Sequence, residues 1–178
     1  MSMRSKRPNR IRASLIMLGA AVAMAQSAPT LAWDTAKMIA VNPQTLKFAP
    51  IPNMPSCVSY ATLRGDPRTG PAWVLLKLAS GCRVPKHWHT PNEDVLIVSG
   101  AGTMTMEDGR TLPFVPGAYA SLPSHHTHQA SCTRACLLFT AADAAYDIHY
   151  VDANGEEVPL DQALKQSAKA KGTKGKKK

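Results

Sequence analysis

The sequence predicts an all-β domain built as a sandwich or a barrel. Short runs of β-branched, aromatic and other apolar residues follow one another between residues 57 and 151. Turn-forming residues separate them, among them GDPRTGP at 65–71, PFVPG at 113–117 and PS at 123–124. The helical candidate LDQALKQSAK near the C-terminus is marginal. A chain of 178 residues is long enough for one domain with a hydrophobic core and too short for two of ordinary size.

Eight segments have the composition of strands. They are residues 57–64, 72–80, 94–100, 102–107, 119–123, 127–132, 135–141 and 146–151. Between the fourth and the fifth, Asp108 and Gly109 predict a hairpin, because both residues tolerate the positive φ of a tight primed turn.

The formal charge of +9 lies at the two ends of the chain. Residues 1–32 contain five basic residues and no acidic one, and residues 165–178 contain seven lysines. Residues 33–164 are therefore mildly acidic, with a formal charge of −3. Because the domain itself is not basic, we expect no specific nucleic-acid partner.

Residues 1–32 are typical of a secretory signal peptide. Five basic residues precede the apolar segment ASLIMLGAAVAMA, and QSAPTLA follows with the small residues of a cleavage site, after Ala32 or after Ala25. The apolar segment is shorter than the roughly 20 residues that cross a bilayer, which argues against a membrane anchor. We therefore expect a periplasmic or secreted protein.

The C-terminal segment KQSAKAKGTKGKKK, residues 165–178, has almost nothing to bury. We expect it to be a disordered basic tail that is attracted to anionic surfaces. It contains no aromatic residue that would stack on a base.

The segment GCRVPKHWHTPNEDVLIVSG carries the strongest functional signal. His87 and His89 are two residues apart, so along a strand both side chains point to the same face. TPN then turns the chain, and Glu93 opens the next strand, where it can point back at the same spot. Two imidazoles and one carboxylate are suited to Fe, Mn, Ni, Cu or Zn. A fourth donor is expected from the segment SHHTH, which offers His125, His126 and His128.

These residues resemble the two motifs of the cupin superfamily. The first motif is matched at each defined position by Gly81, His87, His89, Glu93 and Gly100. The second is matched in part, by Gly117, Pro123 and His128. It departs at His125, where the family usually has glycine, and at Cys132, where it often has asparagine. The first departure leaves open whether His125 or His126 replaces or supplements His128.

The resemblance covers roughly residues 48–152 and implies a double-stranded β-helix, the jelly-roll barrel of a small exported single-domain type 2 cupin. The chain then divides into a signal peptide (1–32), an N-terminal extension (33–47), the cupin domain (48–152) and a Lys-rich tail (153–178). The site that the resemblance implies holds one divalent transition metal ion through His87, His89, Glu93 and His128. Since free histidine takes up a proton near pH 6, metal occupancy is expected to fall as the pH drops through roughly 6.

Cupin barrels include dioxygenases, isomerases, decarboxylases and binding proteins, so the fold does not fix the chemistry. We expect a metal-dependent, oxygenase-type enzyme acting on a small organic molecule. The alternative is a non-catalytic metal or small-molecule binding or sensor protein of the cell envelope. A substrate-sized cavity at the metal favours the enzyme, and a closed metal site favours the binding protein. We also expect a homodimer.

The even number of cysteines in a chain with an export signal predicts disulfides. Cys132 and Cys136 flank TRA, three residues that can close a hairpin, so a cross-strand bridge is expected there. Cys57 and Cys82 then remain as the second pair. In the alternative interpretation, Cys132 is a thiol near the metal, because it lies four residues after His128.

The remaining histidines and tryptophans have structural interpretations. His125 and His126 are expected to be loop residues near the barrel mouth, and His149 an ordinary surface or interface histidine. Trp73 and Trp88 are expected to pack in the core or in a dimer interface.

Overall fold

The computed structural model describes residues 38–174, with side chains up to Lys169. The predicted signal peptide and the last four lysine-rich residues lie outside this range. The strands are β1 (Ala49–Pro50), β2 (Val58–Gly65), β3 (Ala72–Leu78), β4 (Arg83–Trp88), β5 (Glu93–Met106), β6 (Thr111–Pro113), β7 (Tyr119–Leu122), β8 (His128–Ala142) and β9 (His149–Tyr150). A short 3-10 helix, η1 (Pro43–Thr45), precedes them, and helix α1 (Leu160–Lys174) follows.

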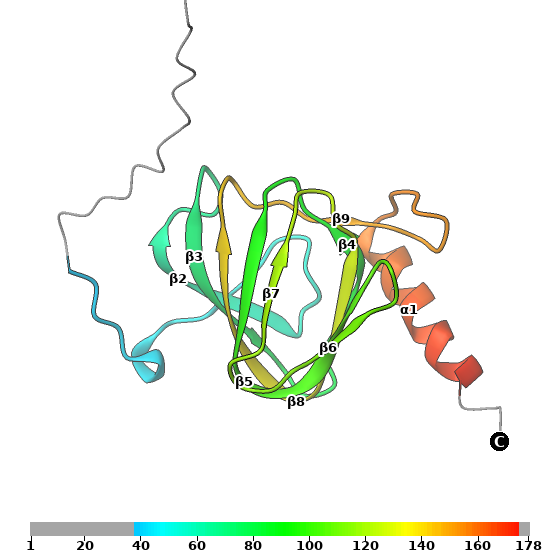
Figure 1. Cartoon of the computed structure of the whole chain (residues 1–178), viewed down its shortest axis with the longest axis horizontal. Coiled ribbons are helices and arrows are strands. Elements are labelled where there is room, and N and C mark those ends of the chain that lie inside the picture. Colours follow the sequence, from blue (N-terminus) through cyan, green and yellow to red (C-terminus); the bar gives the residue numbers. More distant parts are fainter. Residues whose placement is uncertain (1–37, 175–178) are drawn as a thin grey trace, which may run out of the picture. The chain divides into compact units, whose positions relative to one another are not determined.

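The strands form one curled antiparallel sheet, as the predicted β-barrel requires (Figure 1). Its main path runs β1-β2-β3-β8-β4-β9, and β5 pairs with β6, β7 and β8. Strands β5 and β8 are the two longest, and they pair along almost their whole length. On its other side β8 pairs first with β4 and then with β3, so it links the two walls of the barrel.

The long strands β5 and β8 correct the predicted strand pattern. The segments 94–100 and 102–107 belong to one strand, and so do 127–132 and 135–141. The two expected breaks between these segments are a bulge in the pairing of the two strands. Ser99 pairs with Leu137 and Gly102 with Cys132, so an advance of three residues along β5 corresponds to five residues along β8. The bulge lies where β8 changes its partner from β4 to β3.

Two glycines of β5 permit the close approach of this bulge. At Gly100, which has φ +117°, an added Cβ would lie 2.6 Å from the carbonyl oxygen of Ala135. At Gly102 an added Cβ would overlap the carbonyl oxygen of Ser131. Because both obstacles are backbone atoms, a larger residue at either position would force the two strands apart.

Both predicted disulfides are present, Cys57–Cys82 and Cys132–Cys136. The predicted hairpin around the second one is wrong, because both cysteines lie within β8 and the bond closes its bulge. Since Cys132 is disulfide-bonded, it is not a thiol near a metal. By chain entropy, a loop of 25 residues contributes about 3.5 kcal/mol and one of 4 residues about 2 kcal/mol, so Cys57–Cys82 is the stronger constraint. Two disulfides are typical of an oxidising compartment.

The predicted turn at Asp108 and Gly109 joins β5 to β6, with Thr105 paired to Thr111. Only Gly109 has a positive φ, of 83°, so the turn is longer than the tight primed turn expected. Strand β6 ends at Pro113, the first residue of the segment PFVPG expected to form a turn. At the far end, β9 is shorter than predicted, and residues 146–148 form a loop over the barrel mouth.

The barrel interior is the hydrophobic core. Its largest fully buried side chains are Val58, Leu78, Val95, Ile97 and Tyr150. These come from strands far apart in the sequence, and they alternate with outward-facing residues as the pleat requires. The core therefore fixes which side chains of β4, β5 and β8 point inward, and the site residues are among them.

Helix α1 replaces much of the predicted disordered tail. Ala163 is buried in the core cluster and the helix packs against β4, so its first turns are held by the barrel. The helix then continues through Lys174, ten residues into the segment expected to be disordered. Its alanine, glutamine and lysine residues have high helix propensity, and Lys165 pairs with Asp161 one turn earlier at 3.3 Å.

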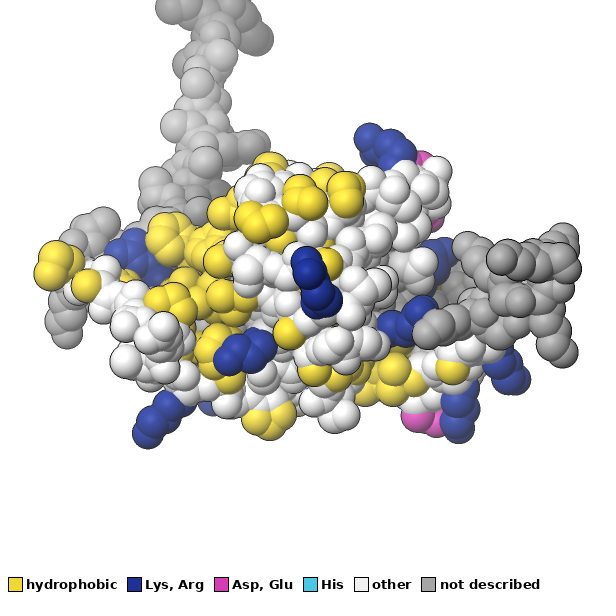
Figure 2. Space-filling view, turned by 90° about the horizontal axis from the view of Figure 1, so that it is seen from below, with side chains coloured by type: hydrophobic (Ala, Val, Ile, Leu, Met, Phe, Trp, Pro, Cys, Tyr) yellow, Lys and Arg dark blue, Asp and Glu magenta, His cyan; other side chains and the backbone are white. Residues whose placement is uncertain are grey.

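The outer surface carries apolar side chains near the N-terminal segment. Figure 2 shows them gathered on that side, whereas lysine and arginine side chains are scattered singly over this face. The exposed residues there include Met38, Ile39 and Val41, and a groove beside them is lined by Trp73 and Phe139. Among residues 38–174, no helix is long and apolar enough to cross a membrane.

Candidate metal centre

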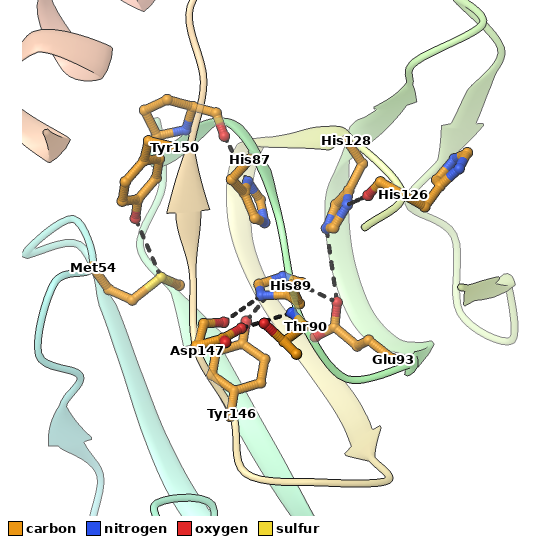
Figure 3. Close-up of polar contacts among 11 residues, drawn as sticks. Met54, His87, His89, Thr90, Glu93, His126, His128, Tyr146, Asp147 and Tyr150 are labelled. Atoms are coloured by element: carbon orange, nitrogen blue, oxygen red, sulfur yellow. Dashed lines mark hydrogen bonds and ion pairs between the residues drawn. The ribbon is translucent and has the colours of Figure 1, made fainter. Parts of the chain in front are cut away.

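Four residues named by the motifs converge inside the barrel (Figure 3). His87 lies on β4, Glu93 opens β5, His128 opens β8, and His89 directly follows β4. None of them is more than 4% exposed. One ring nitrogen from each histidine lies within 4.8 Å of the others, so the three form a group that could hold a metal ion. Oε2 of Glu93 is 3.5 Å from Nε2 of His89 and 3.7 Å from Nε2 of His128.

Backbone carbonyls fix the orientation of all three imidazoles. Nδ1 of His87 contacts the carbonyl of Pro85 at 2.6 Å, and Nδ1 of His128 contacts that of His126 at 3.0 Å. Nδ1 of His89 contacts the carbonyl of Asp147 at 2.5 Å. A carbonyl oxygen only accepts, so each Nδ1 must carry the proton and donate. Each Nε2 is left with a free lone pair, which is the form that binds a metal.

Burial keeps these imidazoles neutral. Desolvation is the main cause that lowers the pKa of His89 to about 4. It also lowers the pKa of His128, and it lowers that of His87 well below its usual range. Neighbouring histidines add to the effect at His87 and His128, because a second positive charge nearby is unfavourable. Neutral imidazoles in the folded protein are therefore available at pH values where free histidine is protonated.

The carboxyl group of Glu93 responds to burial in the opposite direction. Desolvation raises its pKa to about 7, although His128 acts to lower it. A carboxylate here lacks the solvation of bulk water, so a cation among the three histidines would compensate for its burial. A strongly shifted pKa of this kind is common at functional sites.

The turn between His89 and Glu93 is held by two aspartates of the loop 143–148. Asp147 accepts a hydrogen bond from the Thr90 backbone N–H at 2.7 Å. Asp143 accepts from the backbone and side-chain amides of Asn92. Residues outside the first motif thus hold its turn, between His89 and Glu93, in place.

The motif departure at His125 has a conformational explanation. His125 has φ +61°, the left-handed conformation that glycine adopts most easily. Its backbone N–H donates to the carbonyl of His89 at 2.8 Å, and its ring contacts the hydroxyl of Ser124. It is exposed and stacks on Trp88. His125 is therefore a turn residue outside the metal group, as expected.

The other histidines also lie outside the group. Figure 3 shows the ring of His126 directed away from the site, while its carbonyl accepts from His128. His149 is half-buried, stacks on Trp88 at 3.9 Å between ring centroids and contacts Asp147 and Glu157. Trp88 is consequently sandwiched between two histidines, and it is not part of the core.

Tyr146 is the site residue that the sequence did not reveal. Its hydroxyl lies 3.2 Å from Nε2 of His89, and its ring lies 4.6 Å from the His89 ring. Because Nδ1 of His89 carries the proton, the tyrosine hydroxyl is the donor in this contact. Burial raises the pKa of Tyr146 well above its usual range, so the residue is a neutral phenol. No motif marks the position, since it lies 53 residues beyond Glu93 in a loop.

A small cavity adjoins the candidate ligands. Its volume is about 30 Å³, and His87, Glu93, His128 and Tyr146 line it together with apolar core side chains. This is room for an ion with one or two water-sized ligands.

A family comparison identifies the barrel. The model of the ChrR cupin-like domain matches residues 36–145 of the chain. This chain belongs to the ChrR cupin-like family. The predicted membership of the cupin superfamily is thus confirmed. A comparison with curated protein sequences finds no match.

Several solved structures are similar to part of this chain. The polyketide cyclase RemF from Streptomyces resistomycificus has a TM-score of 0.56 and 16% identity, covering 65% of this chain and 87% of that one. An RmlC-like cupin from Shewanella frigidimarina has a TM-score of 0.49 and 16% identity, covering 59% and 88%. Salicylate 1,2-dioxygenase from Pseudoaminobacter salicylatoxidans has a TM-score of 0.44 and 17% identity, covering 49% of this chain but 26% of the dioxygenase. At these identities the likeness concerns the fold alone.

Proposed function

We propose that this cupin binds one divalent transition metal ion through Nε2 of His87, His89 and His128 and the carboxylate of Glu93. The observation that carries the proposal is the shared arrangement of the histidines, each with Nδ1 donating to a carbonyl. Such outer contacts are typical of metal-ligating histidines, because they fix the tautomer and the ring plane. Three imidazoles and one carboxylate suit Fe, Mn, Ni, Cu or Zn.

We further propose that the protein is a metal-dependent, oxygenase-type enzyme acting on a small organic molecule. Four protein ligands leave coordination positions free, and the cavity beside Glu93 has room for small ligands there. A bound metal ion of this kind supplies Lewis-acid or redox chemistry. Without a metal the pKa of Glu93 is about 7, so a bound ion would displace the proton that this carboxyl group holds at lower pH.

The second candidate is a non-catalytic metal-binding or sensor protein. The cavity at the histidines is small and mostly apolar, and beyond the ligands and Tyr146 its only polar lining residue is Thr140. A closed site of this kind favours metal retention over turnover.

Elemental analysis of protein purified from its native compartment tests the metal proposal. We expect one transition metal ion per chain in the wild type and none in His87→Ala. A full complement of metal in His87→Ala would overturn the proposed ligand set. Oxygen uptake by the metal-loaded protein, measured with extracts of small organic molecules from the same cells, then separates the two candidates. Uptake above that of His87→Ala supports the oxygenase, and equal uptake supports the binding protein.

We propose the periplasm or the extracellular space as the working compartment. The predicted signal peptide and the two disulfides support it. Mass spectrometry of the native protein should find a mature N-terminus at Trp33 or Gln26. An intact Met1 in soluble cytosolic protein would contradict this placement.

The homodimer expected from the sequence stays a prediction. The apolar groove at Trp73 and Phe139 beside the N-terminal segment is the surface that supports it. Light scattering of the purified protein should give twice the mass of the chain, and the monomer mass would contradict it.

A further inference from the structure

We propose that a second pocket, at the barrel mouth beside the metal cavity, binds an uncharged and largely apolar organic molecule, and that Tyr146 couples this pocket to the metal. The proposal rests on the proposed function only for the coupling, because the pocket itself is formed by the protein without a metal.

The pocket has a volume of about 340 Å³ and a mostly apolar lining. It lies between the inward-facing side of the β2-β3-β8 wall and the loop that precedes β9. Its apolar lining includes Ile51, Pro67, Leu76, Ala142 and Ile148. At roughly 30 Å³ for each water-sized group, the volume holds a molecule of about ten non-hydrogen atoms. Pockets of this size and composition are typical of small-molecule sites.

The pocket and the metal cavity share a wall. Leu76, Thr140 and Tyr146 line both of them. Leu76 and Thr140 are buried on neighbouring strands, whereas Tyr146 belongs to the loop. The backbone N–H of Tyr146 donates to the carbonyl of Pro67 at 2.8 Å, and this holds the loop against another part of the pocket rim. A molecule in the pocket would therefore contact Tyr146 before it reached the metal.

The charged groups of the pocket are already paired, which favours an uncharged ligand. The guanidinium of Arg68 donates to both carboxylate oxygens of Asp66, at 3.0 and 2.8 Å. The carboxylate of Asp147 accepts from Thr90 and lies 3.3 Å from His149. An anionic ligand would have to compete with Asp66 for the arginine, and burying its charge against the apolar lining would be unfavourable.

The Tyr146 hydroxyl provides the coupling. Without a metal it donates to Nε2 of His89. A metal ion takes the lone pair of that nitrogen, so the hydroxyl loses its acceptor and becomes available to a polar group of a molecule in the pocket. Because binding coupling is reciprocal, the same contact makes a pocket ligand favour metal binding.

Calorimetry with 2-naphthol, which is uncharged at neutral pH, and its anionic analogue 2-naphthoate tests the pocket in the metal-free full-length mature protein. We expect 2-naphthol to bind at least about tenfold more tightly than 2-naphthoate. Ala142→Phe, which fills the pocket, should weaken 2-naphthol about tenfold or more. Its control Ala141→Phe, on the neighbouring position of β8 outside the pocket lining, should leave the affinity within about twofold.

A second variant, Ile51→Ala, removes an apolar contact at the rim and should weaken 2-naphthol severalfold without adding bulk. Thermal melts of each variant, and its zinc uptake in a separate sample, show whether the variant is folded, and misfolded variants are excluded from the comparison. Tighter binding of 2-naphthoate, or equal effects of Ala142→Phe and Ala141→Phe in folded proteins, would overturn the pocket assignment. These arms need no metal, so their failure is distinct from a failure of the metal proposal.

The coupling is tested with zinc-loaded protein. Zinc should strengthen 2-naphthol binding about three- to tenfold in the wild type, the range of one hydrogen bond, and by less than about twofold in Tyr146→Phe. The same gain in Tyr146→Phe as in the wild type would show that Tyr146 is not the link. No gain in the wild type, with zinc bound, would overturn the coupling and leave the pocket standing.

Discussion

Two regions build the candidate metal centre in different ways. Residues 83–93, from β4 to the start of β5, contribute side chains, namely two imidazoles and a carboxylate. The loop 143–148 contributes a backbone carbonyl to His89, a carboxylate to the Thr90 N–H and the hydroxyl of Tyr146. The first region therefore contributes three of the four proposed ligands, and β8 contributes the fourth. The loop orients one of them, His89, and places the Tyr146 hydroxyl beside it.

A substitution in the first region should therefore change metal affinity directly, whereas a substitution in the second should change it by a smaller amount. A lost ligand removes a bond to the metal. A lost hydrogen bond from the loop leaves all four proposed ligands in place and changes only how firmly His89 is oriented for metal binding.

The largest effect is expected from His89→Ala. Loss of partners outside the ligand shell typically costs 10–100-fold in metal affinity, so loss of a ligand should cost more than about 100-fold. Metal-loaded wild type at 100 times its dissociation constant gains about 2.7 kcal/mol of unfolding free energy, and the variant should lose this gain. Isothermal titration and thermal melts with and without zinc measure both quantities.

The matched comparison for this prediction lies in the SHHTH segment. His128→Ala should behave as His89→Ala, and His126→Ala should retain the metal, because only the carbonyl of His126 takes part. Retention after His128→Ala together with loss after His126→Ala would show that the fourth ligand was assigned to the wrong histidine.

The second effect concerns pH and Glu93. The folded pKa of about 7 lies above the ordinary value of 4.5, so metal-free protein holds this proton in a range where the unfolded chain has lost it. Its contribution to stability is complete below pH 4.5 and is lost as the pH rises through 7. Metal binding requires the carboxylate, so below pH 7 each metal ion should release one proton and the affinity should fall about tenfold per pH unit.

Proton release is measured by calorimetry in buffers of different ionisation enthalpy. At pH 8, metal-free Glu93→Gln should be more stable than the wild type by up to about 3 kcal/mol, because the amide carries no buried charge. A release that instead appears only near pH 6 would assign the proton to a histidine, as the sequence alone suggested. Burial argues against this, since the pKa of His89 is lowered to about 4.

The third effect tests the loop through Tyr146→Phe. The hydroxyl must leave Nε2 of His89 when a metal binds, and one hydrogen bond contributes about 0.5–1.5 kcal/mol. The variant should therefore bind zinc up to about tenfold more tightly than the wild type. Weaker zinc binding would mean that the hydroxyl supports the metal, and the contrast between the two regions would fail.

The smallest effect is expected from His125→Gly. Glycine adopts φ +61° without strain, but it loses the stack on Trp88. The two changes oppose each other, so the unfolding free energy should shift by less than about 1 kcal/mol and zinc affinity should not change. A loss of zinc from this variant would place His125 in the metal site after all.

The fold and the convergence of the four motif residues were predictable from the sequence, because both depend on side-chain identity and spacing. The spacing of His87, His89 and Glu93 follows from the two-residue period of a strand and from one turn. The register of His128 followed from the second motif, although its partner position His125 departs from glycine. The φ of His125 is +61°, so the backbone at this position has the left-handed conformation that glycine favours, although the residue is a histidine.

Other features could not be predicted, since they depend on backbone placement. The carbonyl of Asp147 and the hydroxyl of Tyr146 reach His89 only because the loop folds over the barrel mouth. The bulge at Cys132–Cys136 has turn-like composition but continues one strand, because β5 pairs across it. The sequence alone predicts only a marginal helical candidate at LDQALKQSAK, which helix α1 confirms and extends toward the C-terminus. The packing of Ala163 against the barrel, which holds the first turns of the helix, is not visible in the local sequence.

Nitrogen-15 NMR of zinc-loaded protein with labelled histidines tests most directly whether the imidazoles bind through Nε2 while Nδ1 donates to carbonyls. We expect His87, His89 and His128 each to show a protonated Nδ1 and a zinc-shifted Nε2, and His126 and His149 to show neither. Zinc on Nδ1 of any of the three, or an unshifted Nε2 in a protein with stoichiometric zinc, would contradict this expectation.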